Sequence, residues 1–133
     1  MTYTPADIET MIRTVHGEAR GESLLGKIAV AHVILNRANQ GGWWGNTVET
    51  VCRKPWQFSC WNENDPNRSK IMRAEPPELT ESAQAVAFTL SGIWADPTGG
   101  ACHYHTYGLS PAWAKGREPD LQIGAHVFYR GIK

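Results

Sequence analysis

The sequence predicts an α+β fold, mainly helical, with a small antiparallel sheet near the C-terminus. Apolar residues recur at helical spacings in residues 5–40 and again in residues 79–94. Residues 101–107 and 121–130 instead combine alternation with β-branched and aromatic residues, which is typical of strands. A length of 133 residues is enough for a sizeable core, so we expect residues 1–133 to form a single domain.

The first helix is predicted from its cap onward. Thr4 is a capping residue, Pro5 suits the first helical position and Asp7 completes a capping box. Apolar residues then mark one face of the helix: Ile8, Met11, Ile12, Val15 and Ala19. Gly17 weakens the last turn, and Gly21 is expected to end the helix.

The second helix is predicted to begin after the capping residue Ser23 and to run from Leu24 to about Ala38. Its sequence, LLGKIAVAHVILNRA, is apolar almost all round, which indicates a helix buried in the middle of the domain. Three glycines then break the pattern: Gly41, Gly42 and Gly45. A short helical turn is expected over residues 47–52, closed by Pro55.

The rest of the chain alternates loops with regular elements. Residues 55–77 are rich in Asn, Asp, Pro and Trp and are predicted to form a long structured loop, a kind of segment that is usually functional. A third helix follows, with one apolar face: Leu79, Ala83, Val86, Ala87, Leu90 and Trp94. A turn at residues 95–100 leads into the first strand, and residues 108–119 form a wide connection to the second.

Composition argues against several classes of function. Lys plus Arg and Asp plus Glu number 13 each, so no net field attracts nucleic acid or an anionic membrane. No apolar run is long enough to span a bilayer, and we expect no stable membrane association. Three cysteines favour reduced thiols, with a bridge between Cys52 and Cys60 as the alternative. Four of the six tryptophans lie in residues 43–61, which suits core packing or a groove that stacks on sugars.

Glu18 is the main catalytic candidate. On a helical wheel it lies about 20° from Met11, at the edge of the apolar stripe. Loss of hydration and the negative end of the helix both favour a protonated carboxylic acid, which is what a general acid for a glycosidic oxygen must be. The alternative is a glutamate whose stem packs while its carboxylate reaches water or pairs with Arg20 or Arg37. Glu22, four residues on, is a candidate second carboxylate.

Four segments, in order, resemble the SleB-type cell-wall hydrolases, which include the spore-cortex-lytic enzymes. The first is "TVHGEARGESLLGKIAVAHVILNRANQ", which carries the Gly-Glu-Ala-Arg-Gly-Glu motif of that family. The others are "PWQFSCW", "DPTGGACHYH" and "IGAHVFY". Together they extend from Thr14 to Tyr129, nearly the whole chain.

The resemblance implies a lysozyme-like or transglycosylase-like fold that cleaves the MurNAc–GlcNAc β-1,4 bond of peptidoglycan glycan strands. It also implies that Glu18 is the catalytic glutamate and that the reaction is that of a lytic transglycosylase. In that scheme Glu18 protonates the leaving oxygen and then takes a proton from the 6-hydroxyl of the sugar, which closes a 1,6-anhydro ring. A hydrolytic muramidase, in which Glu22 assists a water molecule, is the alternative.

Several other residues are candidates for substrate binding. Gln57 and Phe58 match the Gln-Phe pair of the family and are expected to contact an acetamido group and to form a groove wall. A turn amide and a core ring are the alternatives. On the first strand His103 and His105 share one face and Tyr104 lies on the other, and one of these faces is expected to border the cleft.

Arg20 and Trp113 complete the substrate-binding set. Trp113 is expected either to stack on a sugar or to cap the sheet. Two further histidines are assigned no catalytic role. His16 points away from Glu18 on the wheel and is expected at the surface, and His32 is expected to be a hydrogen-bonded core residue.

Two other classes of function compete with the glycosidase. A zinc-dependent peptidase or amidase would use Cys102, His103 and His105, but no His-Glu-x-x-His motif is present. A non-catalytic sugar-binding module would bind cell walls without cleaving them. We expect a monomeric enzyme that uses no metal or cofactor. Because residues 1–10 show no secretory signal, we expect residence in a host cytoplasm before release to the cell wall, as in a bacteriophage or prophage endolysin.

Overall fold

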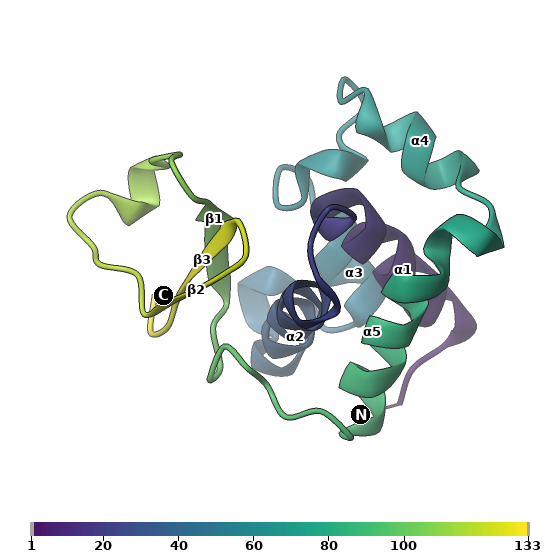
Figure 1. The fold of residues 1–133 in the computed structure, drawn as a ribbon, viewed down its shortest axis with the longest axis horizontal. Helices are drawn as coiled ribbons and strands as arrows, with labels where there is room; N and C mark the ends of the chain where they lie inside the picture. Colours follow the sequence, from purple (N-terminus) through teal and green to yellow (C-terminus); the bar gives the residue numbers. More distant parts are fainter. Residues whose placement is uncertain (1, 133) are drawn as a thin grey trace.

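The computed structural model describes residues 2–132, in which a group of helices packs beside a small sheet (Figure 1). The α-helices are α1 (Pro5–Ala19), α2 (Leu24–Gln40), α3 (Val48–Arg53), α4 (Asn67–Arg73) and α5 (Thr80–Ser91). Short 3-10 helices are η1 (Gly42–Trp44), η2 (Ser59–Trp61), η3 (Pro76–Leu79) and η4 (Ala112–Ala114). The strands are β1 (His103–Thr106), β2 (Leu121–Ile123) and β3 (His126–Tyr129). The predicted α+β class, mainly helical with a C-terminal antiparallel sheet, is confirmed.

The first two helices begin where their capping residues predict. The Thr4 side chain accepts a 3.0 Å hydrogen bond from the Asp7 N–H, and the Asp7 carboxylate accepts one of 3.0 Å from the Thr4 N–H. Ser23 caps α2 by accepting a 3.2 Å bond from the Gly26 N–H. Helix α2 lies between the sheet and the other helices in Figure 1, as its apolar sequence predicts.

The main core forms where α1, α2, α3 and η2 meet. Its large, fully buried side chains include Met11, Val15, Val30, Ile34, Phe58 and Ile71. Ile8 is an exception to the predicted apolar face of α1, because its side chain is exposed.

Residues 55–77, predicted to be a loop, contain the helix α4. The Asp65 carboxylate accepts a 2.7 Å hydrogen bond from the Asn67 N–H, and Pro66 precedes the first turn. Ile71 anchors this helix in the core, where a Cβ added to Gly17 would lie 2.9 Å from Ile71 and from Cys60. The prediction missed α4 because only one of its residues is buried and its composition is that of a loop.

Two predicted elements differ in extent. The third helix ends at Ser91, because Gly92 adopts a left-handed conformation with φ of 76°, so Trp94 lies beyond the helix. The predicted strand 121–130 is a hairpin of β2 and β3, which turns at Gly124 with φ of 58°.

The sheet has the order β1-β3-β2 and is antiparallel throughout. Its inner face packs on α2 through Phe128, which contacts Ala29 and Val33. The turn before β1 is held by Asp96, which accepts hydrogen bonds from Asn36 and from the turn itself. Although burial opposes it, these hydrogen bonds keep the pKa of Asp96 below its usual value.

The cysteines of the structure are free thiols, so the alternative of a bridge between Cys52 and Cys60 is wrong. Both are buried, and burial raises the pKa of Cys52 to about 12. Within residues 2–132, none of the helices has both the length and the apolar character needed to cross a membrane.

Candidate active site

Glu18 lies in the last turn of α1, at the side of a pocket of about 340 Å³ between the helices and the sheet. We call this cavity the Glu18 pocket. Its lining includes Glu18, Gln57, Asn67, Tyr104, His105 and His126. The phenolic hydroxyl of Tyr104 donates a 2.7 Å hydrogen bond to Oε1 of Glu18. The carboxyl group is therefore directed across the gap between α1 and β1.

Tyr104 is held by the inner face of the sheet. Its ring centroid lies 5.6 Å from that of Phe128 and 4.9 Å from that of His126. Burial and the negative charge of Glu18 raise the pKa of Tyr104 well above its usual value, so the phenol keeps its proton. Because the phenol donates to Oε1, the second oxygen of Glu18 is left to carry or accept a proton.

The chain on either side of Glu18 is tightly constrained. Before it, Gly17 allows α1 to approach η2 and α4 closely. After it, the buried ammonium of Lys27 donates to the carbonyl of Glu22 at 2.6 Å and to that of Arg20 at 3.3 Å. The same group also pairs with Glu81 of α5 at 2.8 Å. These contacts give the candidate acid a fixed position.

A second cavity, of about 660 Å³, adjoins the Glu18 pocket. We call it the aromatic groove; its lining includes Arg37, Trp43, Trp44, Trp56, Tyr104 and Trp113. Arg37, Gln57 and Tyr104 line both cavities, which are therefore adjacent. In the tryptophan-rich segment Trp44 is buried, as core packing predicts, while Trp43 and Trp56 are 64% and 75% exposed and line the aromatic groove.

Trp56 has an unusual backbone. It is a non-glycine residue with positive φ, at 69°. This conformation costs a bulky side chain of order 1–3 kcal/mol and persists only where the surroundings impose it. The strained backbone thus presents a large exposed ring at the groove.

The predicted second carboxylate, Glu22, does not line the Glu18 pocket. Its Oε1 accepts a 2.9 Å hydrogen bond from the Ala125 N–H in the turn between β2 and β3, and its side chain is 13% exposed. The same oxygen lies 3.9 Å from Nδ1 of His126. A side chain at Gly124 would collide with this carboxylate. Glu22 therefore joins the start of α2 to the sheet.

Arg20 is also outside the pocket lining. Its exposed guanidinium donates a 2.9 Å hydrogen bond to Oδ1 of Asn67, which does line the pocket. Gln57 lines both cavities, and its contact with substrate stays a prediction. Phe58 is fully buried, and its ring lies 4.9 Å beneath the guanidinium of Arg37. Phe58 therefore supports the groove from below.

The two faces of β1 have different neighbours. Tyr104 reaches Glu18, while His103 and His105 pack against Trp113, with ring centroids 5.0 Å and 5.6 Å away. Both nitrogens of His105 are engaged: Nδ1 donates to the Thr106 carbonyl and Nε2 accepts from the Tyr129 hydroxyl, each at 2.8 Å. Trp113 lines the aromatic groove while it also covers the outer face of the sheet.

The remaining histidines are buried. His16 was expected at the surface, but this is wrong, because its side chain is only 8% exposed. His32 is the predicted core residue, and its Nε2 donates to the Trp94 carbonyl at 3.0 Å. Between residues 2 and 132 there is no group of three or more His, Cys, Asp or Glu side chains placed to hold a metal ion.

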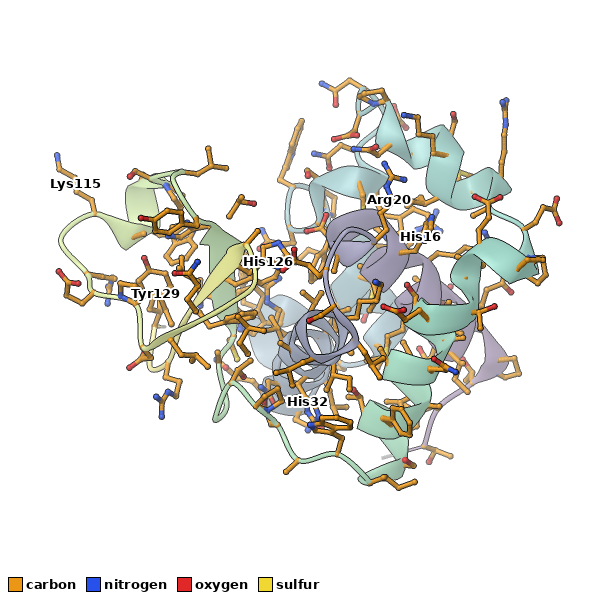
Figure 2. The ribbon with its side chains drawn as sticks, in the orientation of Figure 1. His16, Arg20, His32, Lys115, His126 and Tyr129 are labelled. Carbon is orange, nitrogen blue, oxygen red and sulfur yellow. The ribbon has the colours of Figure 1, made fainter. Side chains whose placement is uncertain are left out.

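Sequence reasoning did not place His126, Asn67 or Arg37 in the lining of the Glu18 pocket. Figure 2 shows His126 at the side of the sheet that faces the helices, with Tyr129 farther from them. Burial lowers the pKa of His126, although the carboxylates of Glu22 and Glu18 oppose the shift. The register of β3 was the available signal, since His126 shares its face with Phe128. No sequence signal indicated Asn67, because helix α4 was not predicted.

The chain is similar to known proteins over most of its length. The family described as Cell Wall Hydrolase matches residues 21–129. The spore cortex-lytic enzymes of Bacillus cereus and Halalkalibacterium halodurans are each 35% identical over 127 residues, and that of Bacillus subtilis is 32% identical. These alignments cover 95% of this chain but 45%, 35% and 38% of the relatives. The chain thus spans less than half the length of the curated relatives it matches.

Two solved structures are similar over almost the entire chain. The crystal structure of the catalytic domain of the Bacillus cereus SleB protein matches with a TM-score of 0.79 and 34% identity, covering 97% of this chain and 93% of that one. The catalytic domain of the germination-specific lytic transglycosylase SleB from Bacillus anthracis matches with a TM-score of 0.78 and 33% identity. That match covers 96% of this chain and 97% of the other.

Proposed function

The chain belongs to the Cell Wall Hydrolase family, and from this premise we propose that it degrades peptidoglycan by cleaving the MurNAc–GlcNAc β-1,4 bond of the glycan strands. Glu18 is the general acid of this reaction. The observation that carries the proposal is the hydrogen bond from Tyr104 to Oε1 of Glu18 inside a pocket adjacent to an aromatic groove.

The first step breaks the bond between C1 of MurNAc and the bridging oxygen. Glu18 gives its proton to that oxygen, which leaves with the GlcNAc residue as a hydroxyl group. The carboxylate that remains is stabilised by the hydrogen bond from Tyr104, whose high pKa keeps it a donor throughout.

The second step forms the 1,6-anhydro ring. The 6-hydroxyl oxygen of the same MurNAc attacks C1, and its proton passes to Glu18, which regenerates the acid. One carboxylate therefore performs both steps. This scheme is supported by the position of Glu22, which is outside the pocket and occupied by the Ala125 N–H. It also agrees with the description of the Bacillus anthracis relative as a lytic transglycosylase.

A hydrolytic muramidase is the second candidate reaction. It needs a group that activates water on the far side of the sugar. Glu22 would act there only through His126, whose Nδ1 lies 3.9 Å from the Glu22 carboxylate and whose ring lines the pocket. A zinc peptidase and a non-catalytic sugar-binding module have less support. The polar side chains of the pocket, such as Tyr104 and Asn67, lie around a carboxyl group that can act as an acid.

The glycan strand occupies the aromatic groove and enters the Glu18 pocket. Trp43, Trp56 and Trp113 offer ring faces to successive sugars, and Gln57 contacts a substituent near the cleaved bond. Asn67, oriented by Arg20, contacts the sugar on the other side of that bond. The expected role as an endolysin held in a host cytoplasm stays a prediction.

The test is digestion of purified peptidoglycan followed by mass spectrometry of the fragments. Anhydro-muramyl ends are expected. Reducing muramic ends would mean a muramidase, and free stem peptides would refute both reactions. A Glu18→Gln variant should keep its fold and lose activity by about 10²-fold to 10⁴-fold. The matched variant Glu22→Gln retains an acceptor for the Ala125 N–H and should keep most activity with the same products.

A further inference from the structure

Arg37 is a buried cation whose hydrogen bonds are incomplete. Its side chain extends from the last turns of α2 and the residue is only 5% exposed. Nε donates a 2.8 Å hydrogen bond to the Cys102 carbonyl, and the guanidinium lies 4.2 Å from the Trp44 ring centroid. Nη1, however, is buried and has no hydrogen-bond partner among residues 2–132.

These contacts do not use the full hydrogen-bonding capacity of the Arg37 guanidinium. The bond to Cys102 satisfies one N–H, and the rings of Trp44 and Phe58 cover the flat faces of the guanidinium. No carboxylate of the described chain pairs with Arg37 within ion-pair distance. A buried, unpaired donor of a charged group carries a penalty of about 1–3 kcal/mol or more. Nη1 is closed to an incoming acceptor, but the other terminal nitrogen, Nη2, has no hydrogen-bond partner among the described residues and is not fully buried. Nη2 is therefore the atom that an incoming acceptor can reach.

The position of Arg37 identifies where that acceptor comes from. Arg37 lines both the aromatic groove and the Glu18 pocket. A sugar that passes from one cavity into the other must pass this side chain. A guanidinium only donates hydrogen bonds, and its planar geometry suits sp² oxygens that accept in the same plane.

We propose that Arg37 is a substrate-binding residue that donates through Nη2 to an acyl oxygen carried by the sugar at the junction of the two cavities. This inference rests on the proposed function. In peptidoglycan, acyl oxygens are found on the N-acetyl group of either sugar and on the lactyl group of muramic acid. Arg37 thereby selects acylated glycans over plain β-1,4-glucans.

The test measures binding in the Glu18→Gln background by calorimetry, so that it does not depend on cleavage. The probes are an N-acetylglucosamine tetramer, a glucose tetramer with the same β-1,4 linkage and no acyl group, and a MurNAc–GlcNAc tetramer. We expect the N-acetylglucosamine tetramer to bind at least about tenfold more tightly than the glucose tetramer. Adding Arg37→Met should reduce that preference to near one.

The matched control is Arg53→Met. Arg53 also lies over a tryptophan, 4.3 Å from the Trp61 ring centroid, but lines neither cavity of the site. It should leave the preference unchanged. If Arg37→Met affects only the MurNAc–GlcNAc tetramer, the lactyl group supplies the oxygen. If Arg37→Met folds and retains every preference, the proposal is wrong.

A second measurement covers the case in which Arg37→Met does not fold. The side-chain N–H signals of Arg37 in the Glu18→Gln chain should shift in nitrogen NMR when an acylated tetramer is added, and not with the glucose tetramer. Absence of any shift on saturation with both acylated tetramers would overturn the inference. If the wild-type chain releases no glycan fragments while these preferences are observed, the proposed function fails and the binding role of Arg37 stands.

Discussion

Tyr104 and Glu18 are 86 positions apart in the sequence and are joined by a 2.7 Å hydrogen bond. This bond connects the two parts of the fold, because Glu18 lies in the last turn of the first helix and Tyr104 belongs to the first strand. The candidate acid is therefore oriented by the sheet as well as by its own helix.

Replacing Tyr104 by Phe should reduce glycan cleavage by about 10-fold to 100-fold, the value of one hydrogen bond to a charged group. The ring would still pack on Phe128, so the free energy of unfolding should change little. Initial rates on purified peptidoglycan measure the effect. Tyr107→Phe is the control, since Tyr107 is exposed and its ring is outside the Glu18 pocket. Equal rates for both variants would remove Tyr104 from the mechanism.

Two substitutions at Trp56 should have the same effect on glycan affinity but different effects on the free energy of unfolding. Stacking that covers about 60 Å² of the ring is worth about 1.5 kcal/mol, so Trp56→Ala should raise the Kd for long glycan fragments by about tenfold. Trp56→Gly should lose the same affinity but be more stable than Trp56→Ala by about 1 kcal/mol, because glycine adopts the positive φ of 69° without strain.

Calorimetric titration and urea unfolding measure the two quantities for Trp56. Ile93→Ala, which removes another exposed apolar side chain away from the groove, should leave glycan affinity unchanged. If both Trp56 variants bind glycan fragments with unaltered affinity, the glycan strand does not contact Trp56.

Replacement by alanine should affect stability at Gly17 but not at Gly21. A Cβ at position 17 would lie 2.9 Å from Cys60 and Ile71, whereas one at position 21 would meet nothing within 4 Å. Overpacking costs about 1–3 kcal/mol and exceeds the gain of about 1 kcal/mol in helix propensity. Gly17→Ala should therefore lower the free energy of unfolding by about 1 kcal/mol, and Gly21→Ala should change it by less than about 0.5 kcal/mol. Urea denaturation of both variants decides the matter.

His103 should make stability depend on pH. Burial, reinforced by the positive charges of Arg37 and Arg117, lowers the pKa of His103 to about 4, whereas an unfolded histidine titrates near about 6.5. In this window the unfolded chain binds the extra proton, so this contribution to stability is complete above about pH 6.5 and is lost as the pH falls towards 4.

The measurement is the urea midpoint at a series of pH values for the wild type and for His103→Gln. The wild type should lose more stability than the variant between about pH 6.5 and 4. Parallel curves would show that His103 is protonated freely in the folded chain.

The helical part of the fold was predictable because its signals are local. The capping groups Thr4 and Ser23 and the apolar sequence of α2 each act within one or two turns. Helix α4 was missed because it is held by one buried residue, Ile71, whose partner Gly17 is far away in the sequence. Gly124 is also a signal for a turn, but the apolar residues on both sides of it favoured one long strand over the hairpin of β2 and β3.

The candidate site shows the same limit. Glu18 was found from its position on one helix, and Tyr104 was found only as one of two possible strand faces. The choice between faces depends on how the sheet docks, which no local pattern encodes. Arg37 was considered as a partner for Glu18, whereas its environment of Trp44, Phe58 and the Cys102 carbonyl comes from three other segments.

The hydrogen bond from the Ala125 N–H to Glu22 has a practical consequence. It joins the hairpin of the sheet to the connection that follows Glu18, so it is present only while both walls of the candidate active site are together. The exchange of this single amide proton with deuterium would thus report how often the two walls separate. Slowing of that exchange by a glycan fragment would reveal occupancy of the cleft without any chemical turnover.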